Sequence, residues 1–283
     1  MTGLVHYLGP ISLGRAPTHF ASLRHMKKDQ GMGKAPTSRI DRLLSSMGYG
    51  TRREIALMAG LGRILLDGAP LSDVGTKISL TPDLPERMRV SGKPLDPLQG
   101  LVIILNKPIG MTCSHKEDGP LVYDLLPPRW RLRNPKISTI GRLDKQTSGL
   151  VLLTDDGELL HRVTSPRRFV PKTYRTRLAR PLQGDEADIF AKGTLKLNGE
   201  DKPLAPARLK VLSKTEALLT ITEGRYHQVR RMFAAVGNHV EALHRESFGG
   251  LHLPENLEAS SWRLMTPEEV TKILDFTPGS SLM

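Results

Sequence analysis

The chain has 283 residues, which suits two domains, and its formal net charge of +12 favours a polyanionic partner such as nucleic acid. No apolar stretch approaches the roughly 18 residues needed to cross a bilayer, so a membrane is the weaker candidate. The only cysteine, Cys113, excludes an internal disulfide and a cysteine-rich zinc site. A lone cysteine also suits a reducing compartment, and we expect a cytoplasmic protein.

Residues 1–36 form a basic, acid-poor N-terminal extension in which Gly, Pro, Ser and His are scattered. This composition favours a disordered tail. An organellar targeting segment, or an upstream start with Met26 or Met32 as the true first residue, are the alternatives. A secretory signal is disfavoured because Gly9 and Pro10 interrupt the only apolar candidate.

Residues 38–95 are predicted to form a small α/β domain. Apolar residues at helical spacing predict a helix over 40–47, and the sequence TRRE at 51–54 is typical of a capping box that starts a second helix. Asp67-Gly68 predicts a hairpin turn between two short strands, and a further strand is expected at 88–90.

Arginines crowd the helical half of this domain and are candidate contacts to an RNA phosphate backbone. They are Arg39, Arg42, Arg52, Arg53 and Arg63. A solvated basic face is the alternative, because basic side chains occur on every soluble surface. The domain's opening RIDRLL, its TRRE and its hairpin GRILLDGAPL resemble the S4-like, or alpha-L, RNA-binding module. That resemblance implies phosphate contacts that supply affinity without reading the base sequence.

Residues 99–283 are predicted to form a second domain, joined to the first by a linker over 94–100. Strand candidates outnumber helix candidates, which favours a mixed, largely antiparallel sheet flanked by helices, and an α+β class overall. The expected strands are 101–105, 150–154, 173–178, 207–212 and 217–222. The expected helices are 157–164, 185–191, 226–236 and 267–274.

A glycine-bounded loop holds a candidate catalytic carboxylate, Asp144. The loop reads GRLDKQTSGL over 141–150 and opens directly into an apolar, β-rich run. Glycines at both ends permit positive φ, and Thr147 and Ser148 can fix the loop's shape through local hydrogen bonds. Considered alone, a loop aspartate is more often a cap or turn former.

Three patches resemble the RNA pseudouridine synthases of the RsuA type. They are the loop at 141–150, PKTY at 171–174 and EGRYHQVRRMF at 223–233. Together with the S4-like module the resemblance covers nearly all of residues 38–265. It implies a cofactor-independent, metal-free isomerase that converts a uridine to pseudouridine in 16S ribosomal RNA, of the pseudouridine(516) synthase type. A 23S rRNA enzyme and a non-catalytic rRNA-binding assembly factor remain the alternatives, and a monomer is expected.

The resemblance assigns catalytic roles to Asp144, Tyr174 and Arg230. Asp144 can act as a nucleophile at the anomeric carbon or as a base at the neighbouring carbon, and the sequence does not choose between them. Arg230 is expected to hold the carboxylate of Asp144 through a bidentate pair in a buried site. Tyr174 is expected to offer a flat face to the uracil.

Four further residues are RNA-binding candidates: Arg142, Lys107, Arg225 and His227. By resemblance Arg142 fills the space left when the target nucleotide leaves its stack, with a phosphate clamp or a plain surface residue as the alternative. The histidines at 227, 239 and 244 lack a cysteine or carboxylate at metal-ligand spacing, so no metal site is expected.

Overall fold

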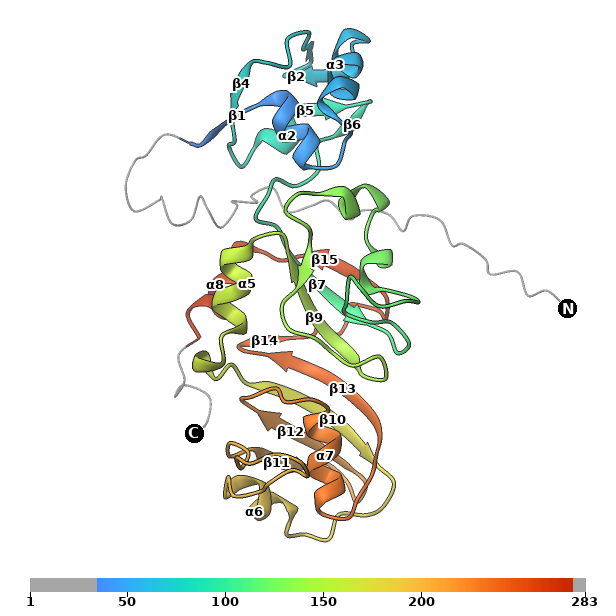
Figure 1. Cartoon of the computed structure of the whole chain (residues 1–283), viewed down its shortest axis with the longest axis vertical. Coiled ribbons are helices and arrows are strands. Elements are labelled where there is room, and N and C mark those ends of the chain that lie inside the picture. The colour runs from blue at the N-terminus through green and yellow to red at the C-terminus, as the bar shows by residue number, and fades with distance from the viewer. Residues whose placement is uncertain (1–34, 277–283) are drawn as a thin grey trace, which may run out of the picture.

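The computed structural model describes residues 35–276, which form a small domain followed by a larger one along the long axis of the molecule (Figure 1). The expectations for residues 1–34 lie outside the described residues. The small domain combines helices with short antiparallel strands, and a single large sheet dominates the other domain, so the α+β class is confirmed.

The small domain follows its sequence closely at its two helices. Its elements are β1 (Thr37–Arg39), α2 (Ile40–Ser46), α3 (Arg52–Gly60), β2 (Ile64–Leu66), β3 (Ala69–Pro70), β4 (Lys77–Ser79), α4 (Leu84–Arg87), β5 (Met88–Val90) and β6 (Lys93–Pro94). The capping box is present, because the Thr51 hydroxyl accepts from the Glu54 amide at 3.3 Å and the Glu54 carboxylate accepts from the Thr51 amide at 2.6 Å. The predicted hairpin is present as β2 and β3, and the strands β1, β4 and β6 and the helix α4 are additions to the prediction.

The larger domain is built on one sheet whose main strands run in the order β11-β12-β10-β13-β9-β7-β15. Their bounds are β7 (Val102–Lys107), β9 (Ser148–Thr154), β10 (Lys172–Leu178), β11 (Arg208–Val211), β12 (Glu216–Ile221), β13 (Val240–Phe248) and β15 (Trp262–Leu264). Short strands β8 (Ser138–Thr139) and β14 (Leu251–His252) pair with β9 and β13. Only β9 and β13 pair in parallel, which confirms a mixed, largely antiparallel sheet.

Helices and loops cover both faces of this sheet. On one face, α5 (Gly157–Thr164) and α8 (Pro267–Leu274) pack on the residues of β7 and β9 that point their way. The other face carries the larger core, which includes α6 (Glu186–Ala191), α7 (Gln228–Ala235) and the 3-10 helices η1 (Val122–Leu125) and η2 (Pro128–Leu132). A third short 3-10 helix, η3 (Pro166–Arg168), follows α5. All four predicted helices are present.

The linker between the domains is clamped by two arginines of the larger domain. Arg129 pairs with Asp96 through two contacts of 2.8 Å, and its guanidinium lies 4.3 Å from the centre of the Tyr49 ring. Arg133 pairs with Asp155 at 2.8 Å, and both side chains are buried. Asp156, the neighbour of Asp155, caps α5 by accepting from the amides of Glu158 and Leu159.

The parallel pairing of β9 with β13 depends on a glycine. Gly149 lies beside Arg245, and the two strands share only the register pairs Ser148 with His244 and Gly149 with Arg245. Gly149 has a φ of +105°, and a Cβ there would lie 2.3 Å from the carbonyl oxygen of Arg245. No side chain larger than hydrogen fits this crossing without a shift of the backbone.

We expect Gly149→Ala to lower the free energy of unfolding by at least about 3 kcal/mol, because it adds a backbone clash to an unfavourable φ. Gly157→Ala is the matched control, since Gly157 has an ordinary φ and no atom within 4 Å of the added Cβ. Urea unfolding of both variants measures the difference. An unfolding midpoint for Gly149→Ala equal to that of Gly157→Ala would contradict this account.

Candidate functional site

The loop that carries Asp144 is held by hydrogen bonds from a buried lysine at the end of β7. Lys107 is fully buried, and its ammonium donates only to backbone carbonyl groups. The acceptors are the oxygens of Thr147 at 2.7 Å, Pro108 at 3.0 Å, Asp144 at 3.1 Å and Lys145 at 3.4 Å. Burial lowers the pKa of Lys107 from its ordinary value. The prediction that Lys107 binds RNA is therefore wrong, because its ammonium is hydrogen-bonded to backbone carbonyl oxygens and its side chain has no access to solvent.

Arg230 also holds the loop through its backbone. Its Nη2 donates to the Gln146 carbonyl oxygen at 3.0 Å, and its Nη1 donates to that of Val240 at 2.6 Å. The expected bidentate pair with Asp144 is absent from the ion pairs of the described residues. The prediction of this pair is wrong because both terminal nitrogens of the guanidinium donate to main-chain carbonyl oxygens, one at the start of β13 and one in the loop. Arg230 ties α7 to the catalytic loop instead of orienting the carboxylate.

His227 is the basic side chain that lies beside Asp144. Its Nε2 is 3.6 Å from Oδ1 of the carboxylate, and each side chain is 39% exposed. His227 precedes α7 with a left-handed backbone, φ 49°, which turns its ring out of the helix toward the loop. Asp144 is therefore part-exposed in the protein alone, and exclusion of water from its carboxylate by a stacked base stays a prediction.

Tyr174 lies on β10 beside β13, with Arg245 as its neighbour in register. Both side chains are buried, and Arg245 Nε donates to the Leu150 carbonyl oxygen at 2.7 Å. Arg245 also pairs with Gly149 of β9, so β13 alone separates the strand of Tyr174 from the strand that follows Asp144. Burial lowers the pKa of Lys172, two residues before Tyr174, to about 8, and the charge of Arg245 adds to the effect.

Two other RNA-binding candidates have different surroundings. Arg142 is 67% exposed and pairs with Glu117 at 3.0 Å, so its side chain can reach a ligand near Asp144. Arg225 instead pairs with Glu200 and with Glu223, the latter at 3.2 Å, and three-quarters of its surface is covered. The prediction that Arg225 contacts RNA is wrong, because its donors are used within the protein.

Three of the five small-domain arginines line a groove between the domains. The groove encloses about 890 Å³, and its basic lining includes Arg39, Arg42, Arg52, Lys77 and Arg133. Arg39 is partly neutralised by Asp41 at 2.8 Å, although its side chain remains 54% exposed. Arg53 and Arg63 are exposed but do not line the groove. A polyanion that follows the groove would pass from the small domain toward the larger one.

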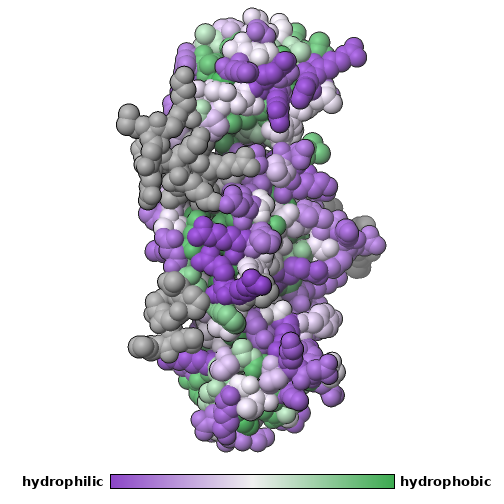
Figure 2. All heavy atoms as spheres, turned by 60° about the vertical axis from the view of Figure 1, so that its left-hand side comes forward, coloured by the Kyte–Doolittle hydropathy of each residue, from purple (hydrophilic) through white to green (hydrophobic). Residues whose placement is uncertain are grey.

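Figure 2 shows hydrophilic side chains over most of one face of the molecule, with apolar ones in small separate patches. Within residues 35–276 no helix is long and apolar enough to cross a bilayer. The same residues contain no cluster of three His, Cys, Asp or Glu side chains that could hold a metal ion. Cys113 is buried in the core, as expected.

The sequence reasoning missed the buried cations at Lys107 and Arg245. The sequence does carry a signal for the burial of Lys107. Ile103, Leu105 and Lys107 share one face of a strand, and the first two lie in the core. No such signal marks Arg245, which stands between polar neighbours in HRES at 244–247.

The chain was compared with protein families and with known proteins. The family model described as RNA pseudouridylate synthase matches residues 101–235. Ribosomal small subunit pseudouridine synthase A of Escherichia coli strain K12 is 42% identical over 242 residues, which are 83% of this chain and 100% of that protein. The enzyme of the same name from Vibrio cholerae is 40% identical over 237 residues, 83% of this chain and 99% of that protein.

A solved structure agrees with these relatives. A crystal structure of a pseudouridylate synthase is 36% identical, covers 83% of this chain and 99% of its own, and superimposes with a TM-score of 0.59. The matched family region contains the loop of Asp144, Tyr174 and His227. The chain therefore belongs to the RNA pseudouridylate synthase family, among the relatives of ribosomal small subunit pseudouridine synthase A.

Proposed function

We propose that this protein isomerises a uridine to pseudouridine in 16S, small-subunit, ribosomal RNA, with Asp144 as the catalytic residue. The observation that carries the proposal is the Asp144 loop, whose backbone is fixed by Lys107 and Arg230 while its carboxylate stays accessible. A protein that only binds RNA gains nothing from this arrangement. The full-length match to enzymes named for the small subunit supports the choice of substrate.

The chemistry needs a carboxylate at the sugar. The bond from the anomeric carbon to the ring nitrogen breaks, the uracil turns, and a ring carbon forms the new bond while its proton moves to the nitrogen. Asp144 can attack the anomeric carbon or remove a proton from the neighbouring carbon, and it is regenerated either way. Nothing is oxidised or hydrolysed. Tyr174, which is buried beside Arg245, would face the uracil.

The remaining parts of the proposal concern RNA binding. Residues 38–95 would act as an S4-like RNA-binding domain and residues 99–283 as the catalytic domain. Arg142, Arg42, Arg52, Arg53, Arg63 and, in part, Arg39 would contact RNA, because they are exposed. The modified nucleotide would be that of the pseudouridine(516) synthases. The protein would act as a cytoplasmic monomer on ribosomal RNA, either naked or within an assembly intermediate.

We expect Asp144→Asn to abolish product formation, with a rate at least about 10³-fold below wild type, because the reacting carboxylate is lost. The measurement is carbodiimide and reverse-transcriptase mapping of pseudouridine on unmodified 16S and 23S RNA. Because Asp144 is part-exposed and its backbone contacts remain, the variant should fold and bind RNA normally.

Asp188→Asn, an exposed carboxylate on α6, is the matched control and should behave as wild type. Full turnover by Asp144→Asn would refute the assignment. Binding without product by the wild-type protein on both RNAs would favour the assembly-factor alternative, and product on 23S RNA alone would favour the large-subunit alternative.

We also expect the combined Arg42→Ala, Arg52→Ala and Arg53→Ala substitutions to weaken RNA binding without changing the rate at saturating RNA. Each lost phosphate contact should lower the slope of log affinity against log salt by about 0.7 to 0.9. A filter-binding titration at several salt concentrations measures this slope. Alanine at Lys192, Arg208 and Lys210 removes the same charge from the β11 edge of the sheet. Equal losses in the two triple variants would show a general charge effect and contradict a specific contact.

A further inference from the structure

Tyr226 presents an exposed aromatic ring next to the catalytic carboxylate. Its side chain is 76% exposed, and apart from Phe169 the described large exposed apolar side chains are aliphatic. One face of the ring stacks on His227, with ring centres 3.9 Å apart and planes 15° from parallel. His227 in turn lies 3.6 Å from Asp144. The ring therefore extends the site outward by one residue and leaves its second face open.

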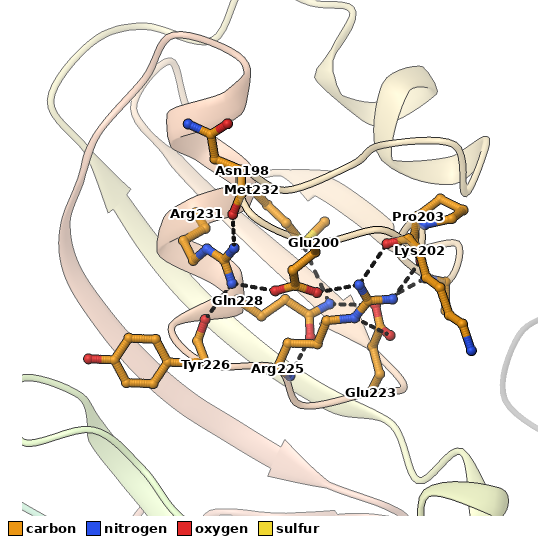
Figure 3. A network of polar contacts seen from close by, with 11 residues as sticks. Asn198, Glu200, Lys202, Pro203, Glu223, Arg225, Tyr226, Gln228, Arg231 and Met232 are labelled. Carbon is orange, nitrogen blue, oxygen red and sulfur yellow. Dashed lines mark hydrogen bonds and ion pairs between the residues drawn. The ribbon is translucent and has the colours of Figure 1, made fainter.

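A network of part-exposed ion pairs holds the backbone next to this ring (Figure 3). The Glu200 carboxylate accepts from Arg225 and from Arg231, which holds the pKa of Glu200 below its usual range. Arg231 also donates to the Tyr226 carbonyl oxygen at 3.2 Å, and the Arg225 amide donates to the Gln228 side chain at 2.9 Å. Figure 3 shows the Tyr226 ring pointing away from this network.

The network therefore positions the backbone of the stacked pair Tyr226 and His227, while the Tyr226 ring points away from the network. If Tyr226 served only stability, its ring would be packed into the core, where burial of its apolar surface would contribute most. Instead, ion pairs of two arginines with two glutamates hold the peptide segment that carries Tyr226. A fixed, open aromatic face is what a nucleobase needs for stacking, since every base has a flat face.

We propose that Tyr226, backed by His227, is a stacking platform for the nucleobase of a nucleotide that flanks the target uridine. This inference rests on the proposed function. In the proposed function the target base faces Tyr174, whose side chain is buried, so the exposed ring of Tyr226 is left for a neighbouring base in the strand. Stacking there would hold the extended strand while the target nucleotide is out of its stack.

We expect Tyr226→Ala to lower kcat/KM for pseudouridine formation by about five- to a hundredfold, the range of one base stack. Tyr226→Phe keeps the ring and should remain close to wild type. Phe169→Ala removes the other exposed ring, which lies before β10, and should have no effect. Near-UV circular dichroism and urea unfolding would establish that Tyr226→Ala is folded, as its exposure predicts.

The decisive comparison uses synthetic RNA with an abasic nucleotide on the 5′ or the 3′ side of the mapped uridine. On one of these RNAs wild type should fall to the level of Tyr226→Ala, and the two proteins should then agree within about twofold. Equal activity of wild type and Tyr226→Ala on intact RNA would overturn the platform, as would a gap that persists on both abasic RNAs. Loss in Tyr226→Phe equal to that in Tyr226→Ala would point to the hydroxyl instead.

Failure of the proposed function gives a different result. If wild type makes no product from any RNA, the isomerase assignment fails, and dissociation constants for unmodified 16S RNA still test whether the ring contacts RNA. Tighter binding by wild type and by Tyr226→Phe than by Tyr226→Ala would support the platform. Equal dissociation constants would refute it.

Discussion

The buried ammonium of Lys107 is the interaction on which the site depends. An unpaired charge in a protein interior is costly, and within residues 35–276 this ammonium forms no ion pair with a carboxylate. It is stabilised by four carbonyl oxygens, three of which belong to the loop of Asp144. The loop can adopt other shapes only by leaving that charge without acceptors. A rigid loop is therefore a condition of folding, and the position of the Asp144 backbone follows from it.

The loop of Asp144 lies next to the shortest pairing between the main strands of the sheet. β9 and β13 share only a two-residue parallel pairing, and antiparallel strands extend from it on either side. The Gly149 crossing lets the two backbones approach, and the buried Arg245 bridges them by donating to Leu150. Two halves of the sheet thus meet at the start of β9, a few residues after Asp144, and the core on each face of the sheet extends across both halves. A strand of RNA laid over this seam can contact residues from both halves.

The sequence predicted those parts of the fold whose signals are local. Capping residues and helical spacing located α3, α5 and α8, and apolar runs located β7 and β9. The long strand β13 was missed because its buried face alternates with polar residues and includes Arg245, so no apolar run marks it. The partners of Lys107, Arg225 and Arg230 could not be predicted, since each bonds to atoms far away in the chain that only the fold brings near.

The absence of an Asp144–Arg230 pair among the described residues changes how the carboxylate is prepared for chemistry. Its backbone is fixed, whereas its carboxylate is part-exposed and lies 3.6 Å from His227. Burial and a bidentate arginine would have dehydrated and oriented the group before RNA arrived. In this arrangement the dehydration must come from the RNA, because a base stacked over Tyr174 and a neighbour over Tyr226 would cover the carboxylate from two sides. Reactivity would then arise only when the correct strand is in place, so that binding and selectivity are parts of the same step.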